Sequence, residues 1–290
     1  MNHKKTAMVA YSSNALVIDE FSTPYSPGML VEWGSITKLV TAHAASILAR
    51  PGGPLPLDTP VESVLGWGLP QSITVRRLVN HTSGLPRVHT GMTSGLLRDP
   101  YRNVDEHVIR QSLASTLKDF PYDCAYSNLG FAILGAVIGR ITGRPWFDFA
   151  KDAIFDEYGI TTATLSPKVG DRVVLQNWRN KVNPPWEIGE SAYSSAGGVW
   201  STLEDLARYG ERFLSDVGET GDWNGWSGTG RLRWHNGQTK YAGSCLVVDP
   251  EQSISLAVHV LEKLPNAADK LALSTISKFL REGPPSEEVG

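Results

Sequence analysis

The chain has 290 residues, 41% of them hydrophobic, which is ample for a folded domain with a buried core. Its 27 Lys and Arg residues and 30 Asp and Glu residues give a net charge of -3, so charge provides no basis for binding nucleic acid or an anionic membrane. The two cysteines, Cys124 and Cys245, are too few for a disulfide scaffold or a metal site, and we expect both to be reduced thiols.

Extended segments are predicted near both ends of the chain. Apolar, β-branched runs bounded by turn residues indicate two hairpins. Ser13-Asn14 separates the strands of the first hairpin, and residues 249–252 form the turn of the second. The predicted extended segments are 6–11, 15–18 and 30–33 near the N-terminus and 241–248 and 254–261 near the C-terminus.

Helical patterns fill most of the middle of the chain and the segment before its C-terminal tail. A capping box, Ser201-x-x-Glu204, is expected to open one of the helices. The polar residues 283–290 are expected to form a disordered tail. The predicted helices, separated by loops rich in Pro and Gly, are 104–118, 128–141, 145–155, 202–214 and 266–281.

Strands at both ends with helices between them indicate an α+β fold. We expect an antiparallel sheet built from both chain ends and flanked by helices, with an inserted helical lobe. We expect a single domain over residues 1–282, with an α/β lobe from about 1–35 and 185–282 and a helical lobe from about 36–184.

Ser35 and Lys38 form a Ser-x-x-Lys motif at the start of an alanine-rich helical pattern that stops at Pro51. Positions i and i+3 share a helix face, so the lysine amine can reach the serine hydroxyl. A serine hydroxyl is a weak nucleophile that needs a base within hydrogen-bond reach, and the N–H groups of a helix N-terminus favour developing negative charge. By itself, the motif is more often a helix N-cap followed by a solvated lysine.

Two later motifs change this interpretation. Tyr126-Ser127-Asn128 precedes the longest apolar helix pattern, and His235-Asn236-Gly237 precedes an apolar strand pattern. In this order, Ser-x-x-Lys, Tyr-x-Asn and a basic residue-x-Gly resemble the serine β-lactamase and penicillin-binding-protein superfamily, in its class C β-lactamase-related branch of esterases, D-stereospecific peptidases and transacylases. The resemblance extends over most of the chain through further blocks at 57–61, 73–86 and 195–207.

The resemblance implies a β-lactamase/transpeptidase-like fold and an acyl-transfer mechanism. Ser35 would attack a carbonyl carbon and become acylated. Lys38 and Tyr126 would share the removal of its proton and the return of a proton to the leaving group. Asn128 would turn towards Lys38 or the substrate amide. The alternative is that Tyr126 is an ordinary half-buried aromatic residue, with Ser127 or Asn128 as the N-cap of the following helix.

The third motif is implied to complete the site. The backbone N–H groups of Ser35 and Gln238 would form the oxyanion hole. Gly237 would let a substrate carbonyl approach the strand edge, and His235 would support the Tyr126 oxygen electrostatically. The alternative for His235 is a histidine at a strand edge without a catalytic role. Gln238 is bulkier than the residue usual at its position, so its side chain can narrow the acyl pocket.

Several other residues have a structural interpretation as the first choice. His81 and His89 are expected to be structural histidines rather than metal ligands. Cys124 is expected to be a small buried residue, with a reactive thiol as the alternative. The tryptophan-rich stretch 222–234 either forms the wall of an apolar acyl pocket or is a surface loop held by its tryptophans.

These inferences predict a serine esterase or amidase that cleaves a small ester or amide through an acyl-Ser35 intermediate, without cofactor or metal. An acyltransferase of small-molecule biosynthesis using the same acyl-enzyme is the alternative among enzymes, and a catalytically silent binding protein is the alternative outside them. No membrane-length apolar segment or signal peptide is recognisable, which predicts a cytoplasmic protein without membrane or nucleic-acid partners. The oligomeric state is left open. Because no glutamate is identifiable as a dedicated deacylation base, efficient β-lactam hydrolysis is not expected.

Overall fold

The computed structural model describes residues 5–92, 99–123, 126–179, 181–217, 225–262 and 266–282. Cys124, Trp223 and the predicted tail 283–290 therefore lie outside the described residues. The chain forms two compact units, each assembled from separate stretches of sequence. The first unit contains Met1–Ile36, Tyr158–Pro185 and Trp200–Gly290, and the second contains Thr37–Glu157 and Trp186–Val199.

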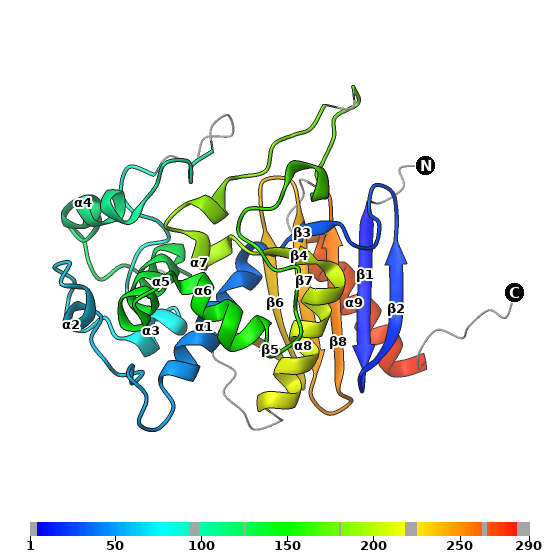
Figure 1. The fold of residues 1–290 in the computed structure, drawn as a ribbon, viewed down its shortest axis with the longest axis horizontal. Helices are drawn as coiled ribbons and strands as arrows, with labels where there is room; N and C mark the ends of the chain where they lie inside the picture. Colours follow the sequence, from blue (N-terminus) through cyan, green and yellow to red (C-terminus); the bar gives the residue numbers. More distant parts are fainter. Residues whose placement is uncertain are drawn as a thin grey trace, which may run out of the picture. The chain divides into compact units, whose positions relative to one another are not determined.

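A six-stranded antiparallel sheet forms the centre of the first unit and combines strands from both ends of the chain (Figure 1). Strand β1 pairs with β8, with Val9 opposite Ala257, so the N-terminal and C-terminal hairpins share one sheet. This arrangement confirms the predicted α+β fold. The strand order is β2 (Ala15–Phe21), β1 (Thr6–Ser12), β8 (Ile254–Val260), β7 (Gly243–Asp249), β6 (Leu232–Gln238) and β5 (Ser227–Thr229).

One helix covers each face of this sheet (Figure 1). Successive side chains of a strand point to opposite faces, and β7 is apolar on both. Cys245 and Val247 belong to the core cluster that includes α9. Leu246, between them, faces Gly210 of α8, where a Cβ atom would lie only 3.0 Å from the leucine side chain. The two helices are α8 (Leu203–Val217) and α9 (Ala267–Glu282).

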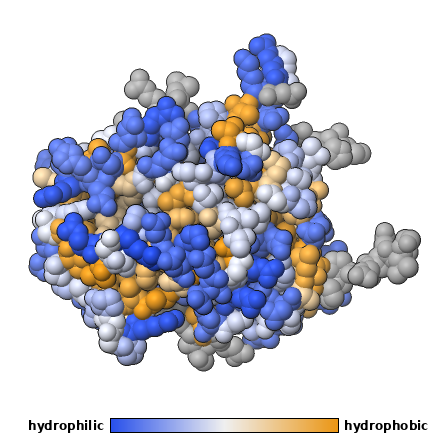
Figure 2. All heavy atoms as spheres, viewed as in Figure 1, coloured by the Kyte–Doolittle hydropathy of each residue, from blue (hydrophilic) through white to orange (hydrophobic). Residues whose placement is uncertain are grey.

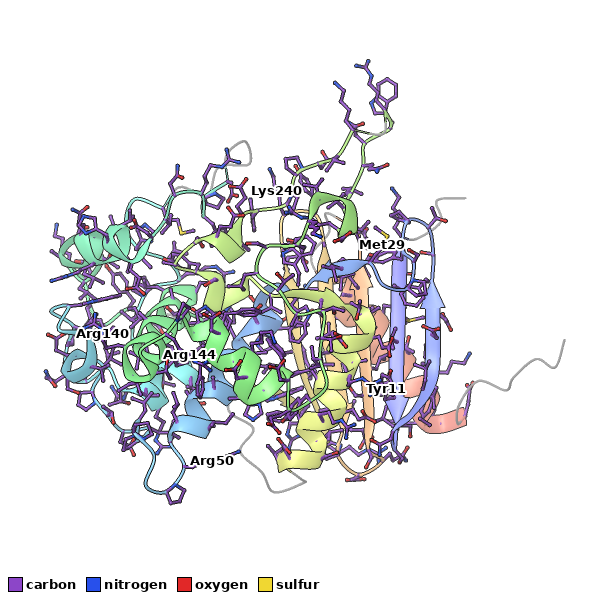
Figure 3. The ribbon with its side chains drawn as sticks, viewed as in Figure 1. Tyr11, Met29, Arg50, Arg140, Arg144 and Lys240 are labelled. Atoms are coloured by element: carbon purple, nitrogen blue, oxygen red, sulfur yellow. The ribbon has the colours of Figure 1, made fainter. Side chains whose placement is uncertain are left out.

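A second, two-stranded sheet pairs β3 (Leu30–Glu32) with β4 (Trp200–Thr202). The position of β4 shows that the predicted capping residue of α8, Ser201, was wrong by one position. Ser201 is buried in β4, whereas the Thr202 hydroxyl oxygen accepts from the N–H of Asp205 at 3.1 Å and so caps α8. The Glu204 carboxylate instead accepts from the hydroxyl of Tyr11 at 2.9 Å, a residue of β1 labelled in Figure 3.

The segment 158–185 also belongs to the first unit and contains the 3₁₀ turn η3 (Val169–Asp171). A bridge between Gln176 and Val182 closes a loop that extends outward (Figure 1), and the end of this loop is hydrophilic in Figure 2. Trp178 near this end is 84% exposed, with the Arg179 guanidinium 4.3 Å from its ring centroid.

The second unit is helical, and α5 lies at its centre. Most residues of α5 are buried, and it contacts α1, α2, α3, α6 and α7. Gly135 lets α7 approach, because a Cβ atom there would lie 2.3 Å from the Ser195 hydroxyl oxygen. The elements are α1 (Thr37–Leu48), α2 (Glu62–Leu65), α3 (Val75–Val79), α4 (Glu106–Thr116), α5 (Asn128–Thr142), α6 (Trp146–Ala150), the π-helix η2 (Lys151–Phe155), the 3₁₀ turn η4 (Ile188–Glu190) and α7 (Ser194–Gly197).

The two units differ from the predicted lobes in two places. Residues 158–184 belong with the sheet rather than with the helices, and residues 186–199 belong with the helices rather than with the sheet. The extended backbone of 158–185 pairs with both strands of the small sheet, which explains its membership of the first unit. The expectation of a single domain over 1–282 stays a prediction.

Candidate active site

Ser35 lies in the 3₁₀ turn η1 (Gly34–Ile36), which is separated from β3 by Trp33 alone and leads into α1. The residues before it are held against the end of β6 in the first unit. Gly34 has φ +53°, and a Cβ atom on it would lie 3.2 Å from the backbone nitrogen of Gln238. Trp33 is fully buried, and its carbonyl oxygen accepts from the Ser244 hydroxyl at 2.8 Å. The chain that carries the Ser35 N–H is therefore fixed beside the chain that carries the Gln238 N–H.

The structure gives a packing reason for glycine at position 237 that the sequence did not suggest. A Cβ atom at this position would lie 2.0 Å from the carbonyl oxygen of Trp33 and 2.4 Å from the Ser244 hydroxyl oxygen. Only glycine allows β6 and the segment before Ser35 to come so close. The predicted approach of a substrate carbonyl to Gly237 stays a prediction.

His235 lies two residues before Gly237, on the same face of β6. It is 6% exposed, and its Nδ1 lies 2.7 Å from the carbonyl oxygen of Asn236. Because a carbonyl oxygen only accepts, Nδ1 carries a proton. The Asn236 side chain points to the other face and donates to Asp269 of α9 at 2.9 Å. His235 is thus a buried imidazole with one nitrogen fixed as a donor.

The Gln238 side chain is anchored on its own hairpin turn. Its Nε2 donates to the carbonyl oxygens of Thr239 at 3.1 Å and Ala242 at 3.0 Å. The turn offers two backbone acceptors within reach, which no property of Gln238 itself reveals. That this side chain narrows an acyl pocket stays a prediction.

The tryptophan-rich stretch is held against the first unit in its described part. The Trp226 ring packs on Phe213 of α8 with centroids 5.2 Å apart. Trp234 packs on the core cluster that includes α9. The two interpretations, a pocket wall and a loop held by its tryptophans, both stay predictions.

Lys38 lies in the first turn of α1, in the second unit, and is completely buried. Its Nζ donates to the carbonyl oxygen of Ala196 at 2.6 Å and lies 4.8 Å from the centroid of the Tyr126 ring. Burial holds the pKa of the Lys38 amine well below its ordinary value, and the positive charge of Arg87 lowers it further. A buried lysine of this kind can act as a neutral base.

The Tyr126 ring is surrounded by basic and aromatic side chains of the same unit. The His81 ring stacks on it with centroids 4.4 Å apart and an interplanar angle of 30°. The Arg87 guanidinium lies 5.3 Å from its centroid. The structure therefore brings two predicted catalytic residues, Lys38 and Tyr126, together.

The segment 81–87 also fixes the backbone around Tyr126. His81 Nδ1 accepts from the Ser127 N–H at 3.1 Å, and the carbonyl oxygen of Arg87 accepts from the Asn128 N–H at 2.9 Å. The Ser127 hydroxyl accepts from the Gly130 N–H at 2.9 Å, so it is the N-cap of α5. Sequence reasoning gave His81 a structural role and did not consider Arg87; the one available signal was their position in, and just after, a block that resembles the family.

Asn128 follows Ser127 at the first position of α5 and is 8% exposed. Asn128 lowers the pKa of the Tyr101 hydroxyl slightly, against the larger raising effect of burial. Its Oδ1 has no hydrogen-bond partner among the described residues. The predicted orientation towards Lys38 is not among the contacts that the structure records for this side chain, so the catalytic role of Asn128 stays a prediction.

The predicted site residues are divided between the two units. The first holds Ser35 with Gly237 and Gln238, and the second holds Lys38 with Tyr126. The unit boundary falls after Ile36, so Ser35 and Lys38 remain only three positions apart along the chain.

The described residues contain no group of three or more His, Cys, Asp or Glu side chains arranged to hold a metal ion. Within the same ranges, no helix has the length and apolar character needed to cross a membrane. The cytoplasmic location stays a prediction.

Two curated proteins are similar in sequence to this chain over part of their length. Penicillin-binding protein 4 of Amycolatopsis lactamdurans is 28% identical over 201 residues, which are 63% of this chain and 50% of that protein. The D-alanyl-D-alanine-carboxypeptidase/endopeptidase AmpH of Escherichia coli K12 is 30% identical over 197 residues, 64% of this chain and 49% of that protein. The chain therefore spans about half the length of these curated relatives.

The fold recurs in a solved structure. The D-amino acid amidase from Ochrobactrum anthropi SV3, complexed with L-phenylalanine amide, superposes with a TM-score of 0.72 at 20% identity, covering 94% of this chain and 93% of that one. At this identity the similarity establishes the fold alone, which is the predicted β-lactamase/transpeptidase-like fold. The β-lactamase family model matches residues 6–276, and since this is nearly the whole chain, the protein belongs to the β-lactamase family.

Proposed function

We propose that this protein is a cofactor-independent serine hydrolase that cleaves a small ester or amide through an acyl intermediate on Ser35. The observation that carries the proposal is the buried Lys38 amine beside the Tyr126 ring, with a pKa lowered by burial. Such an amine is neutral more readily than an exposed one and can accept a proton. The serine that it would activate precedes it by three residues.

The proposed reaction has two halves. The Ser35 oxygen attacks the substrate carbonyl carbon while its proton passes to the Lys38–Tyr126 pair, and the resulting oxyanion accepts from the N–H groups of Ser35 and Gln238. Collapse of the tetrahedral intermediate breaks the bond to the leaving group, which takes the proton. Water then attacks the acyl-Ser35 ester, gives up a proton by the same route, and releases the acid and the free serine.

The names of the relatives suggest which substrates to try first. One relative is a D-alanyl-D-alanine-carboxypeptidase/endopeptidase, and a structural neighbour is a D-amino acid amidase. Peptides ending in D-alanyl-D-alanine and D-amino acid amides therefore belong in the panel beside simple esters. Activity on any of them is a proposal for this chain.

The test compares wild type with Ser35→Ala. Both are incubated with p-nitrophenyl acetate and butyrate while nitrophenol release and intact protein mass are followed. Ser274→Ala is a matched control, because Ser274 is exposed on α9. We expect wild type and Ser274→Ala to release nitrophenol and gain one acyl group, and Ser35→Ala to do neither.

Equal release by wild type and Ser35→Ala, with no acyl adduct on either, would refute the proposed nucleophile. A competing amine or alcohol added to the same reaction distinguishes hydrolysis from acyl transfer. Hydrolysis alone with every acceptor supports the hydrolase. A predominant transfer product would assign the acyltransferase instead.

A further inference from the structure

A carboxyl group is buried immediately before the candidate nucleophile. Glu32 is the last residue of β3, is 7% exposed, and lies three residues before Ser35. Among the described residues it forms no salt bridge; its Oε2 instead accepts from the Thr239 hydroxyl at 2.9 Å. Thr239 directly follows Gln238, the residue that carries the second N–H of the proposed oxyanion hole.

The surroundings of Glu32 leave its charge weakly compensated. Burial raises the pKa of this carboxyl from 4.5 to about 7, against the lowering effects of the Thr239 hydrogen bond and of Arg172. The guanidinium of Arg172 is engaged elsewhere, since its Nε donates to the carbonyl oxygen of Pro167 at 2.8 Å. A second titratable neighbour is Tyr25, whose hydroxyl lies 2.8 Å from Nδ1 of His259 and whose pKa is raised by burial and, to a smaller extent, by Glu32.

Residues 32–34 contact the β6–β7 hairpin at three successive points. The Glu32 carboxyl accepts from Thr239, and the Trp33 carbonyl accepts from Ser244 at 2.8 Å. Gly34 lies against the Gln238 backbone. Figure 3 labels Lys240, which marks the turn of this hairpin. Of the groups that form these contacts, the Glu32 carboxyl is the one that ionises near neutral pH.

The Thr239 hydroxyl has one proton and two acceptors nearby. Its oxygen lies 2.9 Å from Glu32 Oε2 and 3.3 Å from the carbonyl oxygen of Ala242. A carboxylate is the stronger acceptor and takes this proton in a charge-assisted hydrogen bond. A protonated Glu32 would instead donate to the Thr239 oxygen, leaving the hydroxyl proton for Ala242 within the turn. Protonation therefore reverses the hydrogen bond between β3 and the hairpin.

We propose that Glu32 is a positioning residue of the oxyanion hole, whose carboxylate, by accepting from Thr239, holds the chain before Ser35 against the hairpin end that carries the Gln238 N–H. The role rests on the proposed acyl-Ser35 function. Oxyanion donors act only when they are about 2.7–3.1 Å from the developing charge, so a small shift between the two segments weakens the site. The carboxylate form is the active form, and acylation rises as Glu32 loses its proton.

The experiment measures the rate of Ser35 acylation by p-nitrophenyl butyrate from pH 5.5 to 9 in wild type and Glu32→Gln. The informative quantity is the ratio of the two rates, because any pH dependence due to Lys38 is common to both and divides out. We expect the ratio to rise with a midpoint near pH 7 to about tenfold, less than the 10²–10³ that loss of an oxyanion donor costs.

Two further variants separate positioning from a general structural effect. Thr239→Val removes the donor, and we expect it to lose at least as much rate as Glu32→Gln at pH 8.5, with little further loss in the double variant because both changes act on the same contact. Glu20→Gln, at an exposed position of β2, should behave as wild type. Circular dichroism at each pH verifies that the variants are folded.

The outcomes are distinct. A Ser35 adduct in wild type with a rate ratio that does not change with pH, or a Glu32→Gln rate equal to wild type, would overturn the role of Glu32 and leave the proposed function intact. If the ester gives no adduct, a fluorophosphonate probe replaces it in the same series. Failure of both reagents to label Ser35 would overturn the proposed function and, with it, this inference.

Discussion

Replacing Gly237 by alanine tests whether the contact between β6 and the chain before Ser35 sets the geometry of the site. The new Cβ atom would lie 2.0 Å from the Trp33 carbonyl oxygen and 2.4 Å from the Ser244 hydroxyl oxygen, whereas real Cβ atoms essentially never approach within 3.0 Å. The Trp33 carbonyl would therefore have to move by about 1 Å, judged from these separations. It belongs to the backbone and cannot rotate aside as the end of a side chain would.

Two effects of different size follow for Gly237→Ala. Overpacking of a well-packed interior costs about 1–3 kcal/mol of unfolding free energy. A displacement of about 1 Å in a reacting group can lower kcat/KM about 10²-fold. We therefore expect a folded protein with an acylation rate reduced about 100-fold, measured with p-nitrophenyl butyrate and paired with urea unfolding.

Gly243→Ala is the matched control on the adjacent strand. A Cβ atom there meets its nearest neighbour, Gln238, at 3.4 Å, which is ordinary van der Waals contact. This variant should acylate at nearly the wild-type rate. A folded Gly237→Ala protein that acylates as fast as wild type would refute the reasoning, and so would an equal loss in Gly243→Ala.

Three further predictions concern charge and hydrogen bonding around the site. In Arg87→Gln, loss of the positive charge raises the pKa of Lys38, so the rise of acylation with pH moves to higher pH; a profile that is unmoved contradicts this. The Glu32 carboxyl has a pKa of about 7 in the folded state and 4.5 in the unfolded chain, so the folded state loses stability as the pH rises from 4.5 to 7. We expect wild type to lose about 3 kcal/mol of unfolding free energy relative to Glu32→Gln between pH 4.5 and pH 8, measured by urea unfolding. In His81→Ala, the Ser127 N–H loses its acceptor, which should cost about 1–3 kcal/mol, and Asn at position 81 should restore part of it, because Asn offers an acceptor and tolerates the observed φ of +57°.

The fold was predictable where the sequence pattern is local and regular. Both hairpins and the helix after the second one appear in the structure close to their predicted bounds. The segment 158–184 was predicted to lie with the helices, whereas it belongs to the first unit, because it has no regular period of its own. Its membership is decided by bridges to Trp200 and Leu30, which are distant in sequence.

The candidate site was likewise predictable only where residue types and their spacing are informative. The motifs indicated Ser35, Lys38 and Tyr126 because their types and spacing carry chemistry. They did not indicate His81 and Arg87, which act on Tyr126 across about 40 residues of intervening chain, judged from their numbering. Nor could they reveal why position 237 excludes a side chain, since the obstacle is a backbone carbonyl some 200 positions away.

Glu32 illustrates why a residue that weakens the fold bears on function. Burying its carboxyl raises its pKa from 4.5 to about 7, so above neutral pH the charged form costs the folded state about 3 kcal/mol that a neutral glutamine would not. A glutamine has nearly the same shape and could still accept from Thr239. Stability therefore gives no reason for a carboxylate at this position. A charged acceptor holds the Thr239 hydroxyl more strongly than an amide does, and the gain falls on the contact that joins the two N–H groups of the proposed oxyanion hole. If the stability advantage of Glu32→Gln grows between pH 4.5 and 7 while its rate deficit appears with a midpoint near pH 7, one ionisation accounts for the loss of stability and for the gain in rate.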